Sequence, residues 1–149
     1  MINANHYDFV KLKIGPNGFL IFVVSFRTYI MKIIIAGAGE VGFHLAKLLS
    51  YESLDITLID IERDRLNYAE GHLDIKTLRG NACSLSVLKE SNASESDLLI
   101  AVTASESVNI TVCALAKQLG SKRTIARISN IEFTNPKESI SFQDIGVDE

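Results

Sequence analysis

A glycine pattern that begins at residue 37 constrains the fold of this chain more than any other feature. Residues Gly37 to Gly42 read Gly-Ala-Gly-Glu-Val-Gly, which is the pattern G-x-G-x-x-G. The apolar run Ile33 to Ala36 precedes it, and apolar residues recur at helical spacing from Glu40 to Ser50 after it. A short, wholly apolar run is typical of a strand buried on both faces. Strand, glycine turn and helix in this order predict a unit that binds the phosphates of a dinucleotide.

Each glycine of the pattern has a separate physical role. Gly37 permits a tight turn, and Gly39 lacks a Cβ atom, so that a pyrophosphate can approach the backbone. Gly42 allows the helix to pack closely on the strand. The backbone N–H groups of Glu40 to Gly42 and the helix dipole then favour a bound phosphate. The same glycines fit the spacing of a P-loop, but Phe43-His44 replaces the Lys-Ser/Thr pair that a P-loop needs.

Strands and helices alternate along the chain from Met31. The expected strands cover residues 33–36, 56–60, 75–78, 98–102 and 124–128, and the expected helices cover residues 40–50, 63–70, 84–91 and 107–119. In the short third helix, Leu85 and Leu88 are expected to face inward. This alternation predicts an α/β fold, a Rossmann-type doubly wound parallel sheet in three layers, α/β/α.

An acidic residue stands where such a fold binds a ribose. Asp60 ends the second expected strand, close to the ~20-residue offset at which an acid accepts the ribose hydroxyls. Its carboxylate would repel a 2′-phosphate, which favours NAD over NADP. Arg63 and Arg65 follow and weaken that exclusion slightly, although solvated helix charges are their simpler interpretation. Thr103 to Glu106 follow the fourth strand, where they cap the next helix and lie beside the switch point at which ligands bind.

Composition argues against several other functions. The formal net charge is -3 and no block of Lys and Arg runs along the chain, which argues against nucleic-acid binding. Cys83 and Cys113 are far apart and form neither a disulfide framework nor a zinc signature, which suits a reducing cytosol. His44 and His72 have no partner nearby in the sequence that would make either one a base or a ligand, and we expect structural roles for both.

The sequence contains the cofactor half of a redox site and no other half. A dehydrogenase also needs a proton donor and a place for its substrate. No nucleophile, base and acid stand together in a recognisable arrangement. We therefore expect a nucleotide sensor rather than an enzyme. An NAD-dependent reductase whose substrate domain is absent stays open as an alternative.

The two ends of the chain fall outside the alternating pattern. The apolar run Gly18 to Phe26 is shorter than the ~20 residues that span a bilayer, and no small-x-small cleavage site follows it. We expect no working signal peptide and no membrane insertion, and we interpret residues 1–30 as an extension upstream of a translation start at Met31. At the other end, Pro136 is expected to open a last helix, and Ile145 to Glu149 look like the approach to a further element.

From Met31 to Glu149 the chain resembles the N-terminal nucleotide-binding domain of Trk potassium-uptake regulatory subunits, the RCK or KTN class. The resemblance rests on Asp60 and on these segments: Met31 to Gly42, Gly80-Asn81-Ala82, Val102 to Asn109, Ile125 to Ile128 and Ile145 to Glu149. The combination is much more specific than the glycines alone.

The resemblance implies a site with defined parts. The ligand it implies is NAD or NADH, with ATP or ADP as the alternative, because an acid at Asp60 binds the ribose of all of them. Asn81 replaces an Asp that many members carry on the adenine side of the site. The implied contacts are the phosphates with Gly37, Ala38, Gly39, Glu40 and Val41, the ribose with Asp60, the adenine side with Asn81 and Ala82, and the rest of the pocket with Thr103, Ala104 and Arg127.

The resemblance also implies a role. It predicts a homo-oligomer that lies on the cytoplasmic face of the cell membrane and gates a membrane potassium transporter or channel. The cytosolic domain of a potassium/proton exchanger is the other possibility. In the family a small C-terminal ligand domain usually follows, and we expect residues 31–149 to be the nucleotide-binding domain without it.

Overall fold

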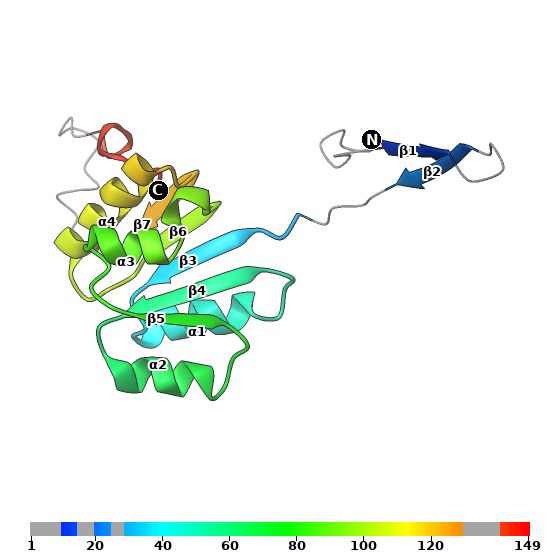
Figure 1. Ribbon diagram of the computed structural model, residues 1–149. Helices are drawn as coiled ribbons and strands as arrows, with labels where there is room; N and C mark the ends of the chain where they lie inside the picture. Colours follow the sequence, from blue (N-terminus) through cyan, green and yellow to red (C-terminus); the bar gives the residue numbers. More distant parts are fainter. Residues whose placement is uncertain (1–9, 15–19, 25–28, 130–140) are drawn as a thin grey trace. The chain divides into compact units, whose positions relative to one another are not determined.

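The structure, a computed structural model, describes residues 10–14, 20–24, 29–129 and 141–149. The chain divides into two compact units, Met1–Ile30 and Met31–Glu149. In the first unit, strands β1 (Val10–Ile14) and β2 (Leu20–Val24) pair antiparallel in a two-stranded sheet of their own (Figure 1). The sequence pattern did not predict these strands.

The second unit is built on a parallel sheet of five strands. In chain order they are β3 (Lys32–Ala36), β4 (Asp55–Asp60), β5 (Lys76–Arg79), β6 (Leu98–Ala101) and β7 (Arg123–Ala126). Their order across the sheet is β5-β4-β3-β6-β7, so the chain moves outward from β3 to β5 and then returns to the other side at β6. The carboxyl ends of β3 and β6 therefore form the switch point at which such sheets bind ligands.

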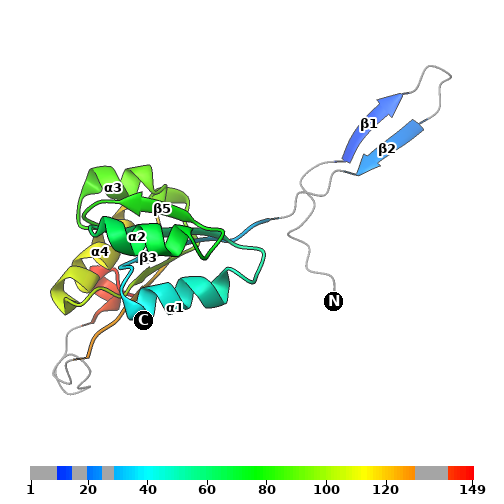
Figure 2. The same cartoon turned by 90° about the horizontal axis from the view of Figure 1, so that it is seen from below.

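Helices cover both faces of this sheet, which confirms the three-layer prediction. The helices are α1 (Glu40–Leu49), α2 (Arg63–Glu70), α3 (Leu85–Glu90) and α4 (Glu106–Leu119), with short 3-10 turns at η1 (Ala93–Glu95) and η3 (Gln143–Ile145). α1 and α2 lie on one face, and α3 and α4 lie on the other (Figures 1 and 2). Among the described residues, no helix is long and apolar enough to cross a membrane.

Strand β3 shows why the central strands are apolar on both sides. Ile33 and Ile35 pack in the core under α1 and α2, whereas Ile34 and Ala36 pack in the core under α3 and α4. Successive side chains of a strand point to opposite faces, so a strand between two helical layers has no exposed side. Each isoleucine removed from water contributes about 1.5–3 kcal/mol, and all three in β3 are at most 3% exposed.

One predicted core residue is wrong. Leu85, expected to face inward from α3, is 50% exposed, whereas Leu88 is fully buried as expected. Val87 packs against the same core as Leu88, which turns the buried side of the helix toward these two residues. Leu85 is the first residue of a helix only six residues long, and its side chain is left on the exposed side.

The end of the chain runs along the free edge of β7. The N–H of Glu149 donates to the Thr124 carbonyl and the N–H of Ala126 donates to the Glu149 carbonyl, at 3.2 and 2.7 Å, which is the pattern of a parallel ladder. The Lys117 ammonium contacts the Asp148 carboxylate at 2.7 Å and, by hydrogen bonding, lowers the pKa of that carboxyl. The segment Ile145 to Glu149, expected to lead to a further element, thus ends in an edge pairing with β7. The helix expected at Pro136 falls outside the described residues.

Candidate functional site

The carboxyl ends of all five strands meet at one edge of the sheet, and every predicted site residue lies in a segment at that edge. Backbone hydrogen bonds extend the ladder past the strand ends and tie these segments to their neighbours. They run from the N–H of Gly37 to Ile59, of Gly80 to Asp60, of Val102 to Ala36 and of Arg127 to Ala101, all between 2.8 and 2.9 Å. The segments therefore form a continuous rim.

The glycine loop after β3 is shaped by close contacts on one side and open space on the other. Gly37 has φ +109°, and a Cβ there would stand 2.9 Å from the backbone nitrogen of Thr103. A Cβ at Gly42 would stand 1.7 Å from the Gly37 carbonyl oxygen. At Gly39, in contrast, no described heavy atom lies within 4 Å of that position. The loop is packed where it faces the sheet and accessible at Gly39.

The start of α1 has amide groups available to an anion. Gly39 is the N-cap residue, with φ −68° and ψ −172°, and no described side chain caps this end of the helix. The first N–H groups of a helix have no acceptor within the helix and carry the positive end of its dipole. Together with the open space at Gly39, this geometry fits a phosphate.

Asp60 has a role that the sequence did not reveal. The residue is 8% exposed, and its Oδ2 accepts a 2.6 Å hydrogen bond from the Ala38 N–H. Its Oδ1 accepts a second bond, 2.8 Å long, from the Glu62 N–H. Asp60 thus fixes the glycine loop against the end of β4. Each carboxylate oxygen has a further lone pair, so the same group can still accept a ribose hydroxyl.

A hollow of about 430 Å³ opens beside the glycine loop, between α1 and α2. The rings of Phe43 and Tyr68 lie 5.1 Å apart along it. Arg65, whose side chain is 56% exposed, brings Nη1 to 3.7 Å from Oδ2 of Asp60. The residues that line the hollow are Ala38, Gly39, Glu40, Phe43, Asp64, Arg65 and Tyr68.

Asn109 joins the two segments on the other side of the switch point. It is 1% exposed, and its Oδ1 accepts from the N–H and the hydroxyl of Thr103 at 2.8 and 2.7 Å. Its Nδ2 donates to the carbonyl oxygens of Thr103 and Arg127. We did not assign this residue to the site from the sequence. The available signal was a polar residue on the apolar side of a predicted helix, which requires buried partners.

The remaining predicted residues differ in how they face the rim. Ala104 and Arg127 are exposed. The Asn81 side chain turns back and accepts the Cys83 N–H at 2.9 Å. Ala82 is 7% exposed and packs in the core with α3 and α4. The structure thus brings Gly37 to Val41, Asp60 and Thr103 together most closely.

The two described histidines, His44 and His72, have local structural partners. Nδ1 of His44 lies 2.7 Å from the carbonyl oxygen of Glu40 in α1, and Nδ1 of His72 lies 2.7 Å from that of Tyr68 near the end of α2. Burial raises the pKa of the Cys113 thiol to about 12, and it also raises the pKa of the Cys83 thiol. Over the part of the chain that the structure describes, no group of His, Cys, Asp and Glu could hold a metal ion.

Comparison with known proteins identifies the family. The model of the TrkA-N domain matches residues 33–149. The chain belongs to the TrkA-N domain family. It is 40% identical over 111 residues to the Trk system potassium uptake protein TrkA of Haemophilus influenzae, covering 74% of this chain and 24% of the relative. Identity to the same protein of Vibrio alginolyticus is 39% over 111 residues, with the same coverage. The chain thus spans about a quarter of the length of these relatives.

Solved structures show the same fold. The TrkA-N domain of inner membrane protein ybaL from Escherichia coli superimposes with a TM-score of 0.68 at 16% identity, covering 80% of this chain and 85% of that one. The GsuK channel bound to NAD gives 0.63 at 17% identity, covering 80% and 21%. GsuK bound to ADP gives 0.64 at 16%, covering 81% and 31%. The Rossmann-type TrkA-N fold predicted from the sequence is confirmed.

Proposed function

We propose that this chain is the nucleotide-binding regulatory domain of a potassium uptake system. In this proposal, NAD or NADH binds at the carboxyl edge of the sheet, and the resulting conformation gates a membrane potassium transporter or channel. The observation that carries the proposal is the glycine loop, which Asp60 fixes in place while Gly39 and the uncapped start of α1 face open space. Membership of the TrkA-N family supports the potassium role.

The residues of the rim fit the parts of a dinucleotide. Gly39 leaves room for a pyrophosphate beside the first amides of α1. Asp60 is placed to accept the ribose hydroxyls with its second lone pairs. Thr103, Ala104 and the Arg127 guanidinium complete the far side of the pocket, with Asn81 and the backbone of Ala82 toward the adenine. A bound dinucleotide would supply a redox-sensitive signal, which the domain reads without carrying out chemistry.

Adenine nucleotides are the second candidate ligands. The phosphate and ribose contacts described above serve ATP or ADP as well as NAD. GsuK, which has the same fold, is known in complex with NAD and in complex with ADP. A Kef C-terminal domain with a TM-score of 0.56 to this chain binds AMP. The competition between these ligands can itself be the signal, because two nucleotides that stabilise different states shift the equilibrium by their differential affinity.

The proposal also covers the cellular location and the oligomeric state of the domain. The domain acts in the cytoplasm as a homo-oligomer, peripheral to the inner face of the membrane, since helix faces of such domains commonly pair about a two-fold axis. Residues 31–149 are the nucleotide-binding domain, and residues 1–30 are an extension that the domain does not need. A domain of a potassium/proton exchanger and a fragment of a reductase are the alternatives.

The first test is ligand-dependent stability. Purified full-length chain is heated with NADH, NAD, ATP, ADP or AMP, and a ligand that binds only the folded form adds about 2.7 kcal/mol at a hundredfold excess over its Kd. We expect at least one of these to raise the Tm, and deletion of residues 1–30 to preserve the rise. No rise with any of the nucleotides would contradict the proposal.

The second test separates a regulator from an enzyme. Solution scattering with each nucleotide measures shape and assembly, and NADH oxidation is followed with a panel of carbonyl compounds. For a regulator, the scattering changes with the bound nucleotide, and the protein does not catalyse NADH oxidation. Turnover at ordinary enzyme rates together with unchanged scattering would favour the reductase.

A further inference from the structure

We propose that Arg65 sets how strongly this site discriminates against a phosphate on the 2′ position of the adenine ribose. The inference rests on the proposed nucleotide function and goes beyond it, because it names the residue that tunes selectivity. An isolated carboxylate at Asp60 would exclude a 2′-phosphate by charge repulsion. The structure shows that this carboxylate is not isolated.

Asp60 is held in one orientation by the backbone. Its two oxygens accept the N–H groups of Ala38 and Glu62 at 2.6 and 2.8 Å, and the residue is 8% exposed. The carboxylate therefore cannot turn away from an incoming ligand without losing both bonds. Any adjustment of charge at this point of the rim has to come from a neighbouring side chain.

Arg65 is that neighbour. Its Nη1 lies 3.7 Å from Oδ2 of Asp60, close enough to offset the negative charge and too far for a hydrogen bond. The side chain is 56% exposed and lines the hollow that opens at Ala38 and Gly39. The guanidinium is thus attracted to Asp60 without a hydrogen bond to it, and its side chain is exposed at the hollow.

A 2′-phosphate would meet this guanidinium. Arg presents a planar fork of N–H donors that binds a phosphate through two hydrogen bonds. A ribose whose hydroxyls face Asp60 places its 2′ substituent beside the same carboxylate, and therefore beside Arg65. A free 2′-hydroxyl needs only Asp60, whereas a 2′-phosphate needs Arg65. The site consequently accepts both kinds of nucleotide, and Arg65 determines the ratio of their affinities.

The experiment measures that ratio by calorimetry on the full-length chain. The ligand pairs are NADH with NADPH, and AMP with adenosine 2′,5′-bisphosphate, so that the ribose is probed with and without a nicotinamide. Arg65→Gln should weaken the 2′-phosphorylated member of each pair by about tenfold or more, as expected for lost bonds to a charged group. The unphosphorylated member should change by less than about threefold.

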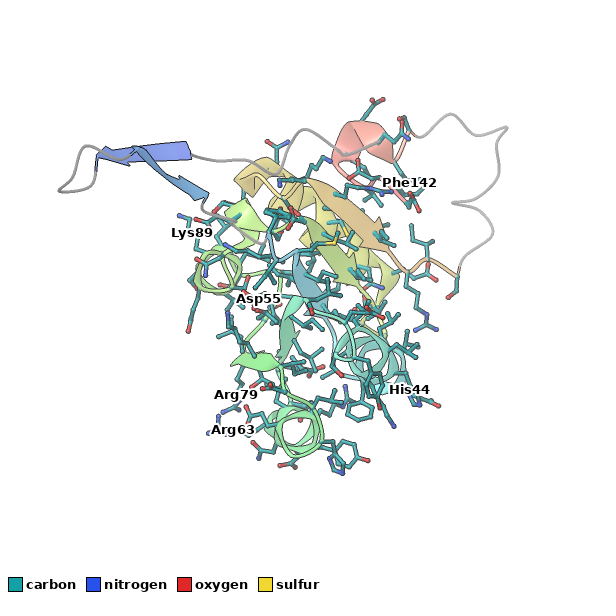
Figure 3. All side chains as sticks on the ribbon, turned by 90° about the vertical axis from the view of Figure 1, so that its right-hand side faces the viewer. His44, Asp55, Arg63, Arg79, Lys89 and Phe142 are labelled. Atoms are coloured by element: carbon teal, nitrogen blue, oxygen red, sulfur yellow. The ribbon has the colours of Figure 1, made fainter. Side chains whose placement is uncertain are left out.

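Arg63→Gln is the matched control. It removes the same charge from the same helix, and Arg63 lies on the side of α2 toward Arg79, away from His44 on α1 (Figure 3). Its effect should be small and equal for both members of a pair, because only long-range attraction is lost. Thermal unfolding of each variant without ligand confirms that the fold is unchanged.

The outcomes are distinguishable. If no nucleotide binds the wild-type chain, the proposed function fails and this inference fails with it. If nucleotides bind but Arg65→Gln weakens both members of a pair equally, or matches Arg63→Gln, nucleotide binding stands and the role of Arg65 is wrong. A wild-type chain that binds no 2′-phosphorylated ligand while it binds NADH or AMP also overturns the role of Arg65.

Discussion

The loops that follow β3 and β6 are neighbours at the switch point, and they are built in opposite ways. The loop after β6 is held by its own side chains, because Asn109 bonds the backbone of Thr103 and Ser105 caps α4. The loop after β3 consists of small residues, has no described side-chain cap at α1, and depends on Asp60 for its one side-chain bond to Ala38. Of the two helix starts, α4 has a described side-chain cap at its N-cap residue and α1 has none.

The difference indicates which loop receives a ligand and which supports it. A helix start whose amides are bonded by its own chain gains little from an anion, whereas an uncapped start gains the full interaction. The loop after β6 then supports the glycine loop, because Gly37 packs directly against it at Thr103. Substitutions in each loop test this division of roles.

The largest effect is expected at Gly42. Gly42→Ala places a Cβ 1.7 Å from the Gly37 carbonyl oxygen, a backbone atom that cannot move aside without shifting the loop. We expect a loss of about 3 kcal/mol in the free energy of unfolding, as for a severe overpacking. Urea denaturation measures the change, because the midpoint falls while the slope is kept.

Gly39→Ala is the matched control for Gly42→Ala. It adds the same methyl group to the same loop, where no described atom lies within 4 Å, so stability should change by less than about 1 kcal/mol. Nucleotide affinity should nevertheless fall, because the methyl group occupies the approach to α1. Equal stability losses in the two variants would show that the loop has no open side.

The next effect tests the support that Asn109 gives to the loop after β6. Asn109→Ala removes the partners of Thr103 and Arg127 and leaves buried backbone groups unsatisfied. The free energy of unfolding should fall by about 2–3 kcal/mol. Thr111→Ala, which loses an exposed hydroxyl from the same helix, should cost less than about 0.5 kcal/mol. If the two variants unfold at the same urea concentration, Asn109 does not stabilise the loop after β6.

The sequence predicted the regular parts of this molecule because their signals are local. The apolar run at β3, the glycine spacing and the helical repeats each lie within one segment, and the five strands and four helices of the second unit follow from them. Boundaries moved by one or two residues, as at β5, which starts at Lys76 rather than at residue 75.

What the sequence did not predict depends on partners that are distant along the chain. The bond from Ala38 to Asp60 joins residues 22 apart, and the bond from Asn109 to Arg127 joins residues 18 apart. Periodicity also placed Leu85 in the core, because a helix of only six residues is too short for the pattern to fix which side is buried. Hydrophobic patterns fix which elements form, whereas polar contacts between them decide how the loops at the rim are held.

Asp60 supplies the one described side-chain hydrogen bond to the loop after β3. Asp60→Asn keeps the size of the side chain and removes its charge, and an amide cannot accept at both positions that the carboxylate serves at Ala38 and Glu62. Calorimetry should show nucleotide affinity reduced by about tenfold or more. Glu62→Gln removes the same charge from an exposed neighbour and should leave affinity within about threefold. Unchanged affinity in a folded Asp60→Asn variant would make the ribose assignment wrong.

The smallest effects are expected when the side-chain cap of α4 is removed at Ser105 and a cap is added to α1 at Gly39. Ser105 caps α4 by accepting the Val108 N–H at 3.4 Å, so Ser105→Ala should cost about 1 kcal/mol of stability and leave nucleotide affinity nearly unchanged. Gly39 has the extended ψ of a capping residue, so Gly39→Ser can bond the amides of α1 itself. That variant should gain a few tenths of a kcal/mol and lose affinity, because its hydroxyl competes for the donors that a phosphate would use. If the loop after β3 binds the phosphate, Gly39→Ser should raise the free energy of unfolding and lower the nucleotide affinity. Urea denaturation and calorimetry measure the two changes. If Gly39→Ser bound nucleotide as well as the wild-type chain, the amides at the start of α1 would not be the phosphate site.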